Sequence, residues 1–162
     1  MAGTVEQRTG AQGLSWPLDV RSITRVGDTV TDHRPGSGRP HRGVDIFAAA
    51  GTAIVAASAG VVSKVVDGRF TSESHRKRAG LYIDVTSDGG IIFRYLHLGS
   101  VYVGVGDKVN RGKLIADIGP AYTSGAEKPH LHFEMRVGLS RQIPDGYGKP
   151  LDPLKLLPQR NA

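Results

Sequence analysis

The chain has 162 residues and no cysteine, which excludes disulfide bonds, thiolate metal sites and a cysteine nucleophile. Its length predicts one domain with a substantial core, and its 39% hydrophobic and 22% charged residues are ordinary for a globular protein. The net charge of +6 suits an anionic partner, such as nucleic acid, a membrane surface or a cell-wall polymer. Aromatic residues make up only 6% and no basic helix is visible, so a nucleic-acid-binding module is not expected.

Short runs of Val, Ile and Thr alternate with turns rich in the 22 glycines and 9 prolines. No long window has helical periodicity, so the fold class is mostly β. Residues 1–15 lack the apolar core of a signal peptide, and we expect a flexible leader there, followed by a single domain over 16–158. No apolar run is long enough to predict a membrane span.

The predicted elements follow one another closely along the chain. After a loop over 27–40, we expect strands near 41–47, 53–56, 60–66, 81–86, 91–95, 108–110, 113–118 and 129–137. The strands at 81–86 and 91–95 read as a hairpin around Ser87-Asp88-Gly89-Gly90. Three connections are predicted at 67–79, 98–107 and 119–129, the second with one helical turn, and a short helical turn should start at Asp152.

The segment Pro129-His-Leu-His-Phe-Glu134 has the alternation of a β-strand. In a strand, His130, His132 and Glu134 share one face, and the apolar residues between them point to the opposite face and the core. Neutral imidazole is the commonest metal ligand. Glu134 on the same face suggests either an acceptor that orients a ligand or an ordinary ion pair or strand-end cap, and the sequence does not decide between them.

A second candidate pair of ligands is His41 and Asp45. In a fully extended segment their Cα atoms would be roughly 13 Å apart, too far for one metal ion. A shared ion therefore requires a bend, which Gly43 permits. With His97, the chain offers five candidates for a zinc site that needs three ligands, and the other two could supply the acid–base pair.

This ordered set of residues resembles the lysostaphin-like zinc endopeptidases of bacterial cell walls, peptidase family M23. The similarity runs from about Arg39 to Glu134 and more loosely to Pro153. It rests on six motifs, namely His41-x-x-x-Asp45, Gly51-Thr52, Gly60-Val61-Val62, Tyr95-Leu96-His97-Leu98, Val105-Gly106-Asp107-Lys108-Val109 with Gly112, and Pro129 to Glu134. The resemblance implies a compact antiparallel β-sheet or barrel-sandwich domain with its active site in a groove.

The resemblance also implies roles for five residues. His41, Asp45 and His132 would bind Zn²⁺, and His97 and His130 would activate water and stabilise the tetrahedral intermediate, without a division of labour between them. The implied reaction is hydrolysis of peptide bonds in peptidoglycan, at stem cross-links or bridges. The enzyme would then act as a monomer in the periplasm, the cell wall or the extracellular space.

Two alternatives remain open at this stage. A domain of this fold without zinc could bind or activate another wall hydrolase, and a phage-borne lysin or tail domain would use the same chemistry in another setting.

Many relatives carry an aromatic residue just before the first ligand, where this chain offers Arg34 or Arg39. His33 and His75 lie in polar loops and are expected to be surface residues.

Overall fold

The computed structural model describes residues 13–30, 41–69, 79–121, 128–137 and 149–160. Almost every regular element within these ranges is a strand, as the composition predicted. The elements are η1 (Val20–Ser22), β1 (Arg25–Val26), β2 (Val44–Phe47), β3 (Ala53–Val55), β4 (Gly60–Asp67), β5 (Leu81–Thr86), β6 (Ile91–Leu96), β7 (Leu98–Val101), β8 (Lys108–Val109), β9 (Leu114–Ile118), β10 (His130–Val137), β11 (Lys149–Leu151) and α3 (Pro153–Leu156).

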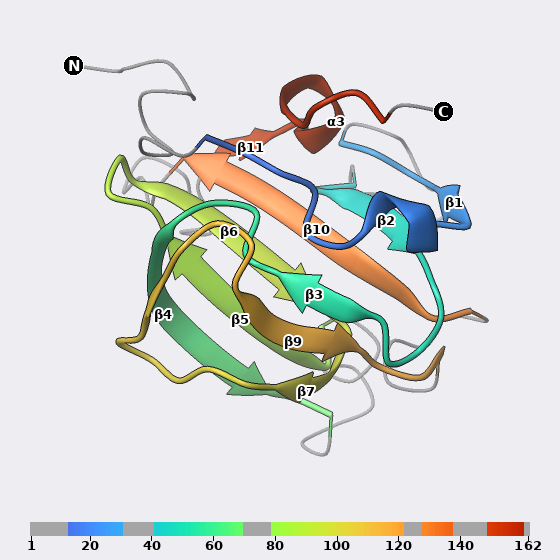
Figure 1. Cartoon of the computed structure of the whole chain (residues 1–162), viewed down its shortest axis with the longest axis horizontal. Helices are drawn as coiled ribbons and strands as arrows, with labels where there is room; N and C mark the ends of the chain where they lie inside the picture. Colours follow the sequence, from blue (N-terminus) through green and yellow to red (C-terminus); the bar gives the residue numbers. More distant parts are fainter. Residues whose placement is uncertain (1–12, 31–40, 70–78, 122–127, 138–148, 161–162) are drawn as a thin grey trace.

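The larger of two sheets has eight antiparallel strands and is organised around β10 (Figure 1). Its order is β1-β2-β10-β6-β5-β4-β8, and β11 also pairs with β10. On the edge of β10 away from β6, β2 pairs with His130 to Phe133 and β11 pairs with Met135 to Val137. Strand β10 is therefore held on both sides along most of its length, which makes it a rigid support for any site that it carries.

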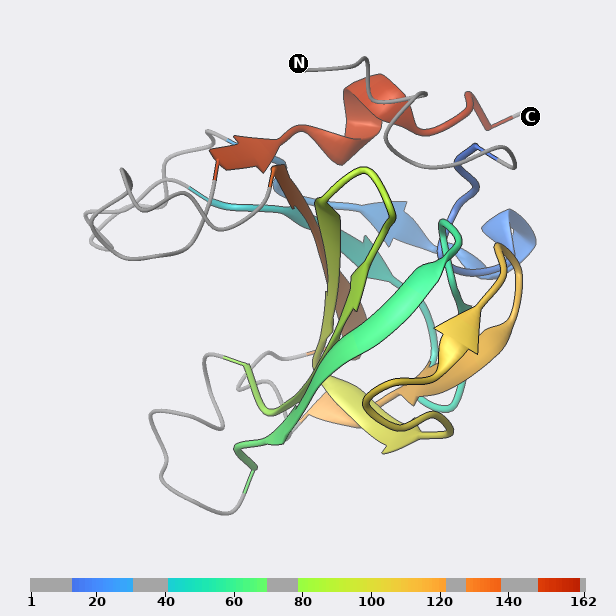
Figure 2. The same cartoon turned by 90° about the vertical axis from the view of Figure 1, so that its left-hand side faces the viewer.

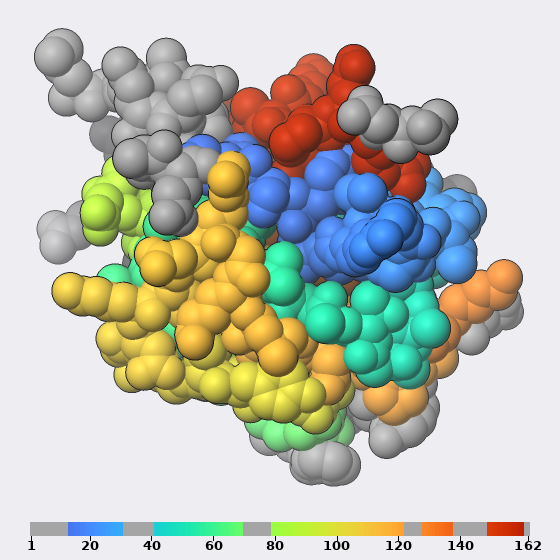
Figure 3. Space-filling view, viewed as in Figure 1, coloured from blue at the N-terminus to red at the C-terminus, as the bar shows by residue number. Residues whose placement is uncertain are grey.

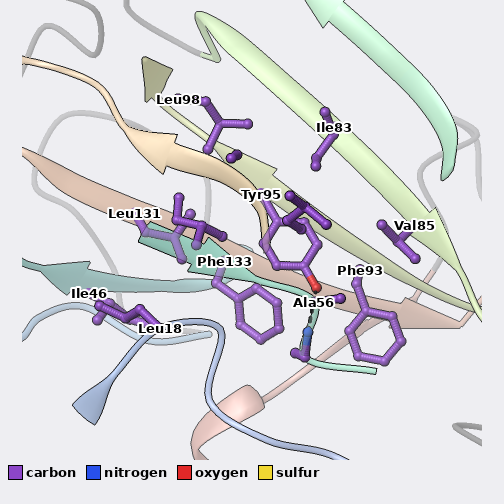
Figure 4. Packing of buried hydrophobic residues seen from close by; sticks show 14 of the residues in the cluster. Leu18, Ile46, Ala56, Ile83, Val85, Phe93, Tyr95, Leu98, Leu131 and Phe133 are labelled. Carbon is purple, nitrogen blue, oxygen red and sulfur yellow. Dashed lines mark hydrogen bonds between the residues drawn. The ribbon is translucent and has the colours of Figure 1, made fainter. Parts of the chain in front are cut away.

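The smaller sheet, of order β3-β9-β7, packs across the larger one and closes a core between them (Figures 1 and 2). Phe93, Tyr95 and Phe133 pack against one another within this core, beside Leu131 (Figure 4). Met135 lies on the same face of β10 as Leu131 and Phe133 and is also fully buried. The buried Tyr95 hydroxyl accepts a hydrogen bond from the backbone N–H of Ala57, at 3.0 Å. This bond joins the large sheet to the segment after β3.

The chain passes from the large sheet to the small one through a single residue, His97. Strand β6 ends at Leu96, β7 begins at Leu98, and His97 has φ +70°, which is uncommon for a residue other than glycine. The expected connection over 98–107 with a helical turn is wrong in its first part, because Leu98–Val101 forms strand β7 and pairs with β9. Alternation of apolar residues did not reveal this strand, because it follows β6 directly through the left-handed residue His97, which the sequence does not mark.

The two ends of the described chain lie beside each other on one face of the molecule (Figure 3). The Trp16 indole N–H donates to the carbonyl of Pro158, and the Ser15 N–H donates to the carbonyl of Ala57, so packing contacts begin just before the predicted boundary at Trp16. The predicted helical turn is present as α3, where the Asp152 carboxylate accepts from the Leu154 N–H. None of the helices in the described ranges is long and apolar enough to cross a membrane.

Candidate metal centre

The two faces of β10 differ completely in chemistry. Leu131, Phe133 and Met135 enter the core, and His130, His132 and Glu134 lie on the opposite face. Residues directly opposite in an antiparallel ladder share a face, and His132 is opposite Asp45 of β2. The register of β2 on β10 therefore brings these two polar side chains together.

The remaining member of the cluster reaches it through a bend at Gly43. His41 precedes strand β2, and its Nε2 lies 3.4 Å from Oδ1 of Asp45. The predicted bend is present, and it brings Gly43 against β10. A Cβ atom on Gly43 would lie 2.9 Å from Cγ of Glu134 and 3.0 Å from Nε2 of His132, and it would clash with the carbonyl of Phe133. Only glycine allows this close approach.

Three possible ligand atoms converge at this point. Nε2 of His41 lies 3.1 Å from Nδ1 of His132, and Nδ1 of His132 lies 2.8 Å from Oδ1 of Asp45. Zinc ligands at 2.0–2.1 Å in a tetrahedron are about 3.3 Å apart, close to the three separations here. Among the described residues, His41, Asp45 and His132 form the one group of three that could hold a metal ion.

Hydrogen bonds on the outer side of each imidazole define which nitrogen faces the cluster. Nδ1 of His41 faces the carbonyl of Thr29 at 3.3 Å, and Nε2 of His132 faces Oε1 of Glu134 at 2.9 Å. Carbonyl and carboxylate oxygens only accept hydrogen bonds, so these nitrogens carry the hydrogens. The opposite nitrogens can then direct their lone pairs at Asp45, and three electron-rich atoms in contact require a cation. The residues present therefore fit a zinc ion.

The electrostatics of the metal-free cluster agree with this. Without a metal ion, the nitrogens that face Asp45 can carry hydrogens in place of lone pairs. Burial alone would raise the pKa of Asp45, but hydrogen bonds with His132 and His41 hold that pKa well below its usual range. Burial alone would lower the pKa of His132, but the hydrogen bonds to Asp45 and Glu134 outweigh it and raise the pKa to about 9. The cluster therefore favours positive charge at its centre, either as a proton or as a metal ion.

His130 and His97 lie beside the cluster, and their rings are 4.8 Å apart between centroids. Nδ1 of His130 faces the carbonyl of Lys128 at 3.2 Å, which leaves Nε2 directed at the cluster, 3.7 Å from Oδ1 of Asp45. Burial, followed by repulsion from His132 and His130, lowers the pKa of His97 well below its usual value, so this ring is neutral at neutral pH. Nδ1 of His97 is buried without a hydrogen-bond partner in the described structure.

The structure thus brings all five predicted site residues together, at the junction of β2, β6 and β10. Four other residues named in the sequence analysis lie outside the described residues, namely His33, Arg34, Arg39 and His75. The predicted connections over 67–79 and 119–129 also fall largely in ranges that are not described, and the groove remains a prediction.

Several neighbours of the site were missed by the sequence analysis. Phe47 stacks on His130 with centroids 5.0 Å apart, and Arg25 lies over Phe47 at 4.1 Å. Asp84 and Arg94 form a buried ion pair further along the same face. Asp84 and Arg94 are each the one charged residue of their strand. A lone charge of this kind indicates pairing with a charge on a neighbouring strand, and it could have been read from the sequence.

The antiparallel β fold and the His-Asp-His cluster define the class of protein. Residues 39–153 match peptidase family M23, and the chain belongs to that family. The catalytic domain of lysostaphin from Staphylococcus simulans superposes with a TM-score of 0.65 at 27% identity, over 81% of this chain and 90% of that one. A zinc-containing peptidase from Vibrio cholerae has a TM-score of 0.67 at 27% identity, over 90% of this chain and 41% of that one.

Relatives found by sequence similarity include a peptidoglycan endopeptidase and lysostaphin. The peptidoglycan DD-endopeptidase ShyC of Vibrio cholerae is 34% identical over 125 residues, which are 76% of this chain and 27% of the relative. Lysostaphin of Staphylococcus simulans is 36% identical over 101 residues, which are 62% of this chain and 19% of the relative. The chain therefore matches only a minor part of the length of these relatives.

Proposed function

We propose that this chain is a zinc-dependent endopeptidase that hydrolyses peptide bonds in peptidoglycan. The observation that carries the proposal is the cluster of His41, Asp45 and His132, beside two further histidines on a sheet face with the M23 fold. Relatives that carry this domain include endopeptidases of peptidoglycan. The substrate lies outside the cytoplasm, so we place the activity in the periplasm or at the cell wall.

His41, Asp45 and His132 would hold the zinc ion. When bound, zinc lowers the pKa of a water ligand to about 7 and polarises the substrate carbonyl. His130 directs Nε2 toward this position and is the better placed base for a proton of the attacking water. His97 is neutral and buried, and it can donate a hydrogen bond to the developing oxyanion.

A substrate contact is suggested by the row of side chains next to the cluster. Arg25 is opposite Phe47, and Phe47 is opposite His130, so all three lie on the same face of the sheet. Among the described residues, no carboxylate pairs with Arg25, which is exposed. Two strand spacings, about 10 Å, separate it from β10, or roughly three residues of extended peptide. Arg25 is therefore placed to contact a carboxylate of a stem peptide.

The test uses purified sacculi and measures soluble peptide released over time, with mass analysis of the fragments to identify the cleaved bond. The parent should release peptide, lose activity in chelator and recover it with zinc. His132→Ala should lose both bound zinc and hydrolysis, whereas Lys108→Ala, an exposed change on β8, should retain both. Release by His132→Ala at the parental rate would contradict the ligand assignment.

The alternative of a non-catalytic module that binds or activates a wall hydrolase predicts a different result. Such a protein would bind sacculi without releasing peptide, and would purify without zinc. The presence of all three ligands and both additional histidines favours the enzyme. A phage-borne lysin or tail domain would share the proposed chemistry. The same mass analysis of released fragments would identify the bond that it cleaves.

A further inference from the structure

Beyond the ligands, the polar face of the large sheet carries a buried network of four charged residues that ends on His132. Glu134 Oε1 accepts from His132, and Glu134 Oε2 accepts from Arg136 at 3.2 Å. Arg136 also donates to Asp84 at 3.2 Å, and Asp84 accepts twice from Arg94, at 2.7 and 2.9 Å. The network spans β5, β6 and β10.

The register of three strands builds this network. Glu134 is opposite Arg94, which is opposite Asp84, so all three lie in one row across the sheet. Arg136 lies two residues further along β10, on the same face as Glu134. The four residues are between 3% and 9% exposed. The two carboxylates and two guanidiniums of these four described residues balance without a contribution from His132.

Burial of four charges is costly, and the packed alternative of apolar residues is often as stable or more stable. A stabilising role alone therefore accounts poorly for the network. Its geometry accounts better for the position of Glu134. Arg136 binds Oε2 of the Glu134 carboxylate, so Oε1 remains directed at Nε2 of His132. As an acceptor, Oε1 keeps a hydrogen on that nitrogen.

We propose that Glu134, held by Arg136, Asp84 and Arg94, is a positioning residue that keeps Nε2 of His132 protonated and Nδ1 directed at the zinc. The inference rests on the proposed metal site, and it assigns a purpose to a charged network that the hydrolytic reaction does not itself require. Without the acceptor, the ring can rotate or exchange its hydrogen between nitrogens, and zinc must select the correct arrangement.

The test compares two double variants that differ only at position 134, where one side chain has an amide and the other has a thioether with no oxygen acceptor. Glu134→Gln with Arg136→Met retains an oxygen that can accept from His132, whereas Glu134→Met with Arg136→Met has a similar volume and no such oxygen. Both remove one carboxylate and one guanidinium, and both leave the pair of Asp84 and Arg94 intact. The zinc dissociation constant is measured at fixed pH by competition with a chelator.

We expect the variant with Met at both positions to bind zinc about 10- to 100-fold more weakly than the variant with Gln. In ¹⁵N spectra of the zinc-loaded proteins, the Nε2–H signal of His132 should be present with Gln and lost or broadened with Met. Asp67→Asn, at the end of β4, removes an ion pair with the half-buried Arg69 and should leave zinc affinity unchanged. Equal zinc affinity and equal spectra for the two double variants would overturn the proposal.

The outcomes also separate this inference from the proposed function. A parent that binds no zinc would overturn both ideas. A parent that binds zinc but releases no peptide from sacculi would contradict the endopeptidase activity alone. Thermal unfolding of the metal-free double variants reports any purely structural role, because a loss of stability common to both variants leaves the difference in zinc affinity unaffected.

Discussion

The two faces of strand β10 are both buried but are stabilised in opposite ways. On one face, Leu131, Phe133 and Met135 exclude water by packing against aromatic and aliphatic side chains of both sheets. On the other, His132 and Glu134 are buried within hydrogen bonds and ion pairs. Burial alone therefore does not identify a core, because β10 carries a core and a candidate metal site on alternate residues.

The apolar face should govern stability much more than metal binding. Phe133→Ala removes a fully buried ring and should lower the free energy of unfolding by about 3–5 kcal/mol. Its zinc dissociation constant should change less than tenfold, since the backbone of β10 stays paired with β2 and β6. Urea unfolding and chelator competition measure the two quantities. Leu114→Ala, at a position that is 48% exposed, is the control and should cost far less stability.

The polar face should show the reverse. His97→Asn removes a neutral imidazole beside the cluster but retains a residue type that tolerates positive φ. We expect kcat/KM for peptide release to fall about 10²-fold or more, which is about 2.7 kcal/mol of transition-state stabilisation. Zinc content should remain at the parental level. An unchanged rate in a variant that retains zinc would exclude His97 from the reaction.

A polar group within the apolar face offers an intermediate case. Tyr95→Phe retains the ring but leaves the buried N–H of Ala57 without its acceptor, and should cost about 1–3 kcal/mol in the free energy of unfolding. Tyr102→Phe removes an exposed hydroxyl that donates to Asp117, and serves as the matched control. If the two variants lose equal stability, the buried hydrogen bond between Ala57 and Tyr95 contributes no more to the free energy of unfolding than the exposed one between Tyr102 and Asp117.

The pH dependence of stability sharpens the comparison further. Burial and the neighbouring His132 and His130 hold the pKa of His97 well below 6.5, with Asp45 opposing them. Below pH 6.5 the unfolded chain binds a proton that folded His97 does not, so stability is lost as pH falls. This group contributes up to about 1.4 kcal/mol per pH unit. Urea titrations between pH 5 and 7 should give a shallower slope for His97→Asn than for the parent.

The smallest effect is expected at the edge of the polar face. Arg25→Gln should raise KM about two- to five-fold for a peptide with a free carboxylate, in line with the modest free energy of an exposed ion pair. An amidated form of the same peptide should respond little. Arg21→Gln makes the same change of charge in η1 and should leave KM unchanged. An equal response to both peptides would argue against a carboxylate contact.

The sequence was most informative where a feature depends on neighbouring residues. Three local features are predicted by the sequence and present in the structure, namely the alternation in β10, the bend at Gly43 and the cap at Asp152. Strand β7 was missed because it depends on a left-handed residue at His97, which the sequence does not mark. Interactions between strands are non-local and need the register, which the sequence alone does not specify.

Glu134 illustrates this limit most clearly. Two interpretations were open, a ligand-orienting acceptor and an ion pair, and the side chain makes both contacts through its two oxygens. The other two members of the network, Asp84 and Arg94, lie 50 and 40 residues earlier in the chain. Only the pairing of β5, β6 and β10 brings them into one row with Glu134 and brings Asp84 to Arg136.

His97 has a mechanical consequence as the joint between the two sheets. One residue both turns the chain out of β6 into β7 and carries an imidazole to the edge of the site. Its carbonyl accepts from Gly119 after β9, and its N–H donates to Ala79 before β5. The tilt of the small sheet and the reach of this ring therefore cannot vary independently. We therefore expect a substitution that displaces β7 to displace the ring of His97 as well, although it touches none of the three candidate ligands.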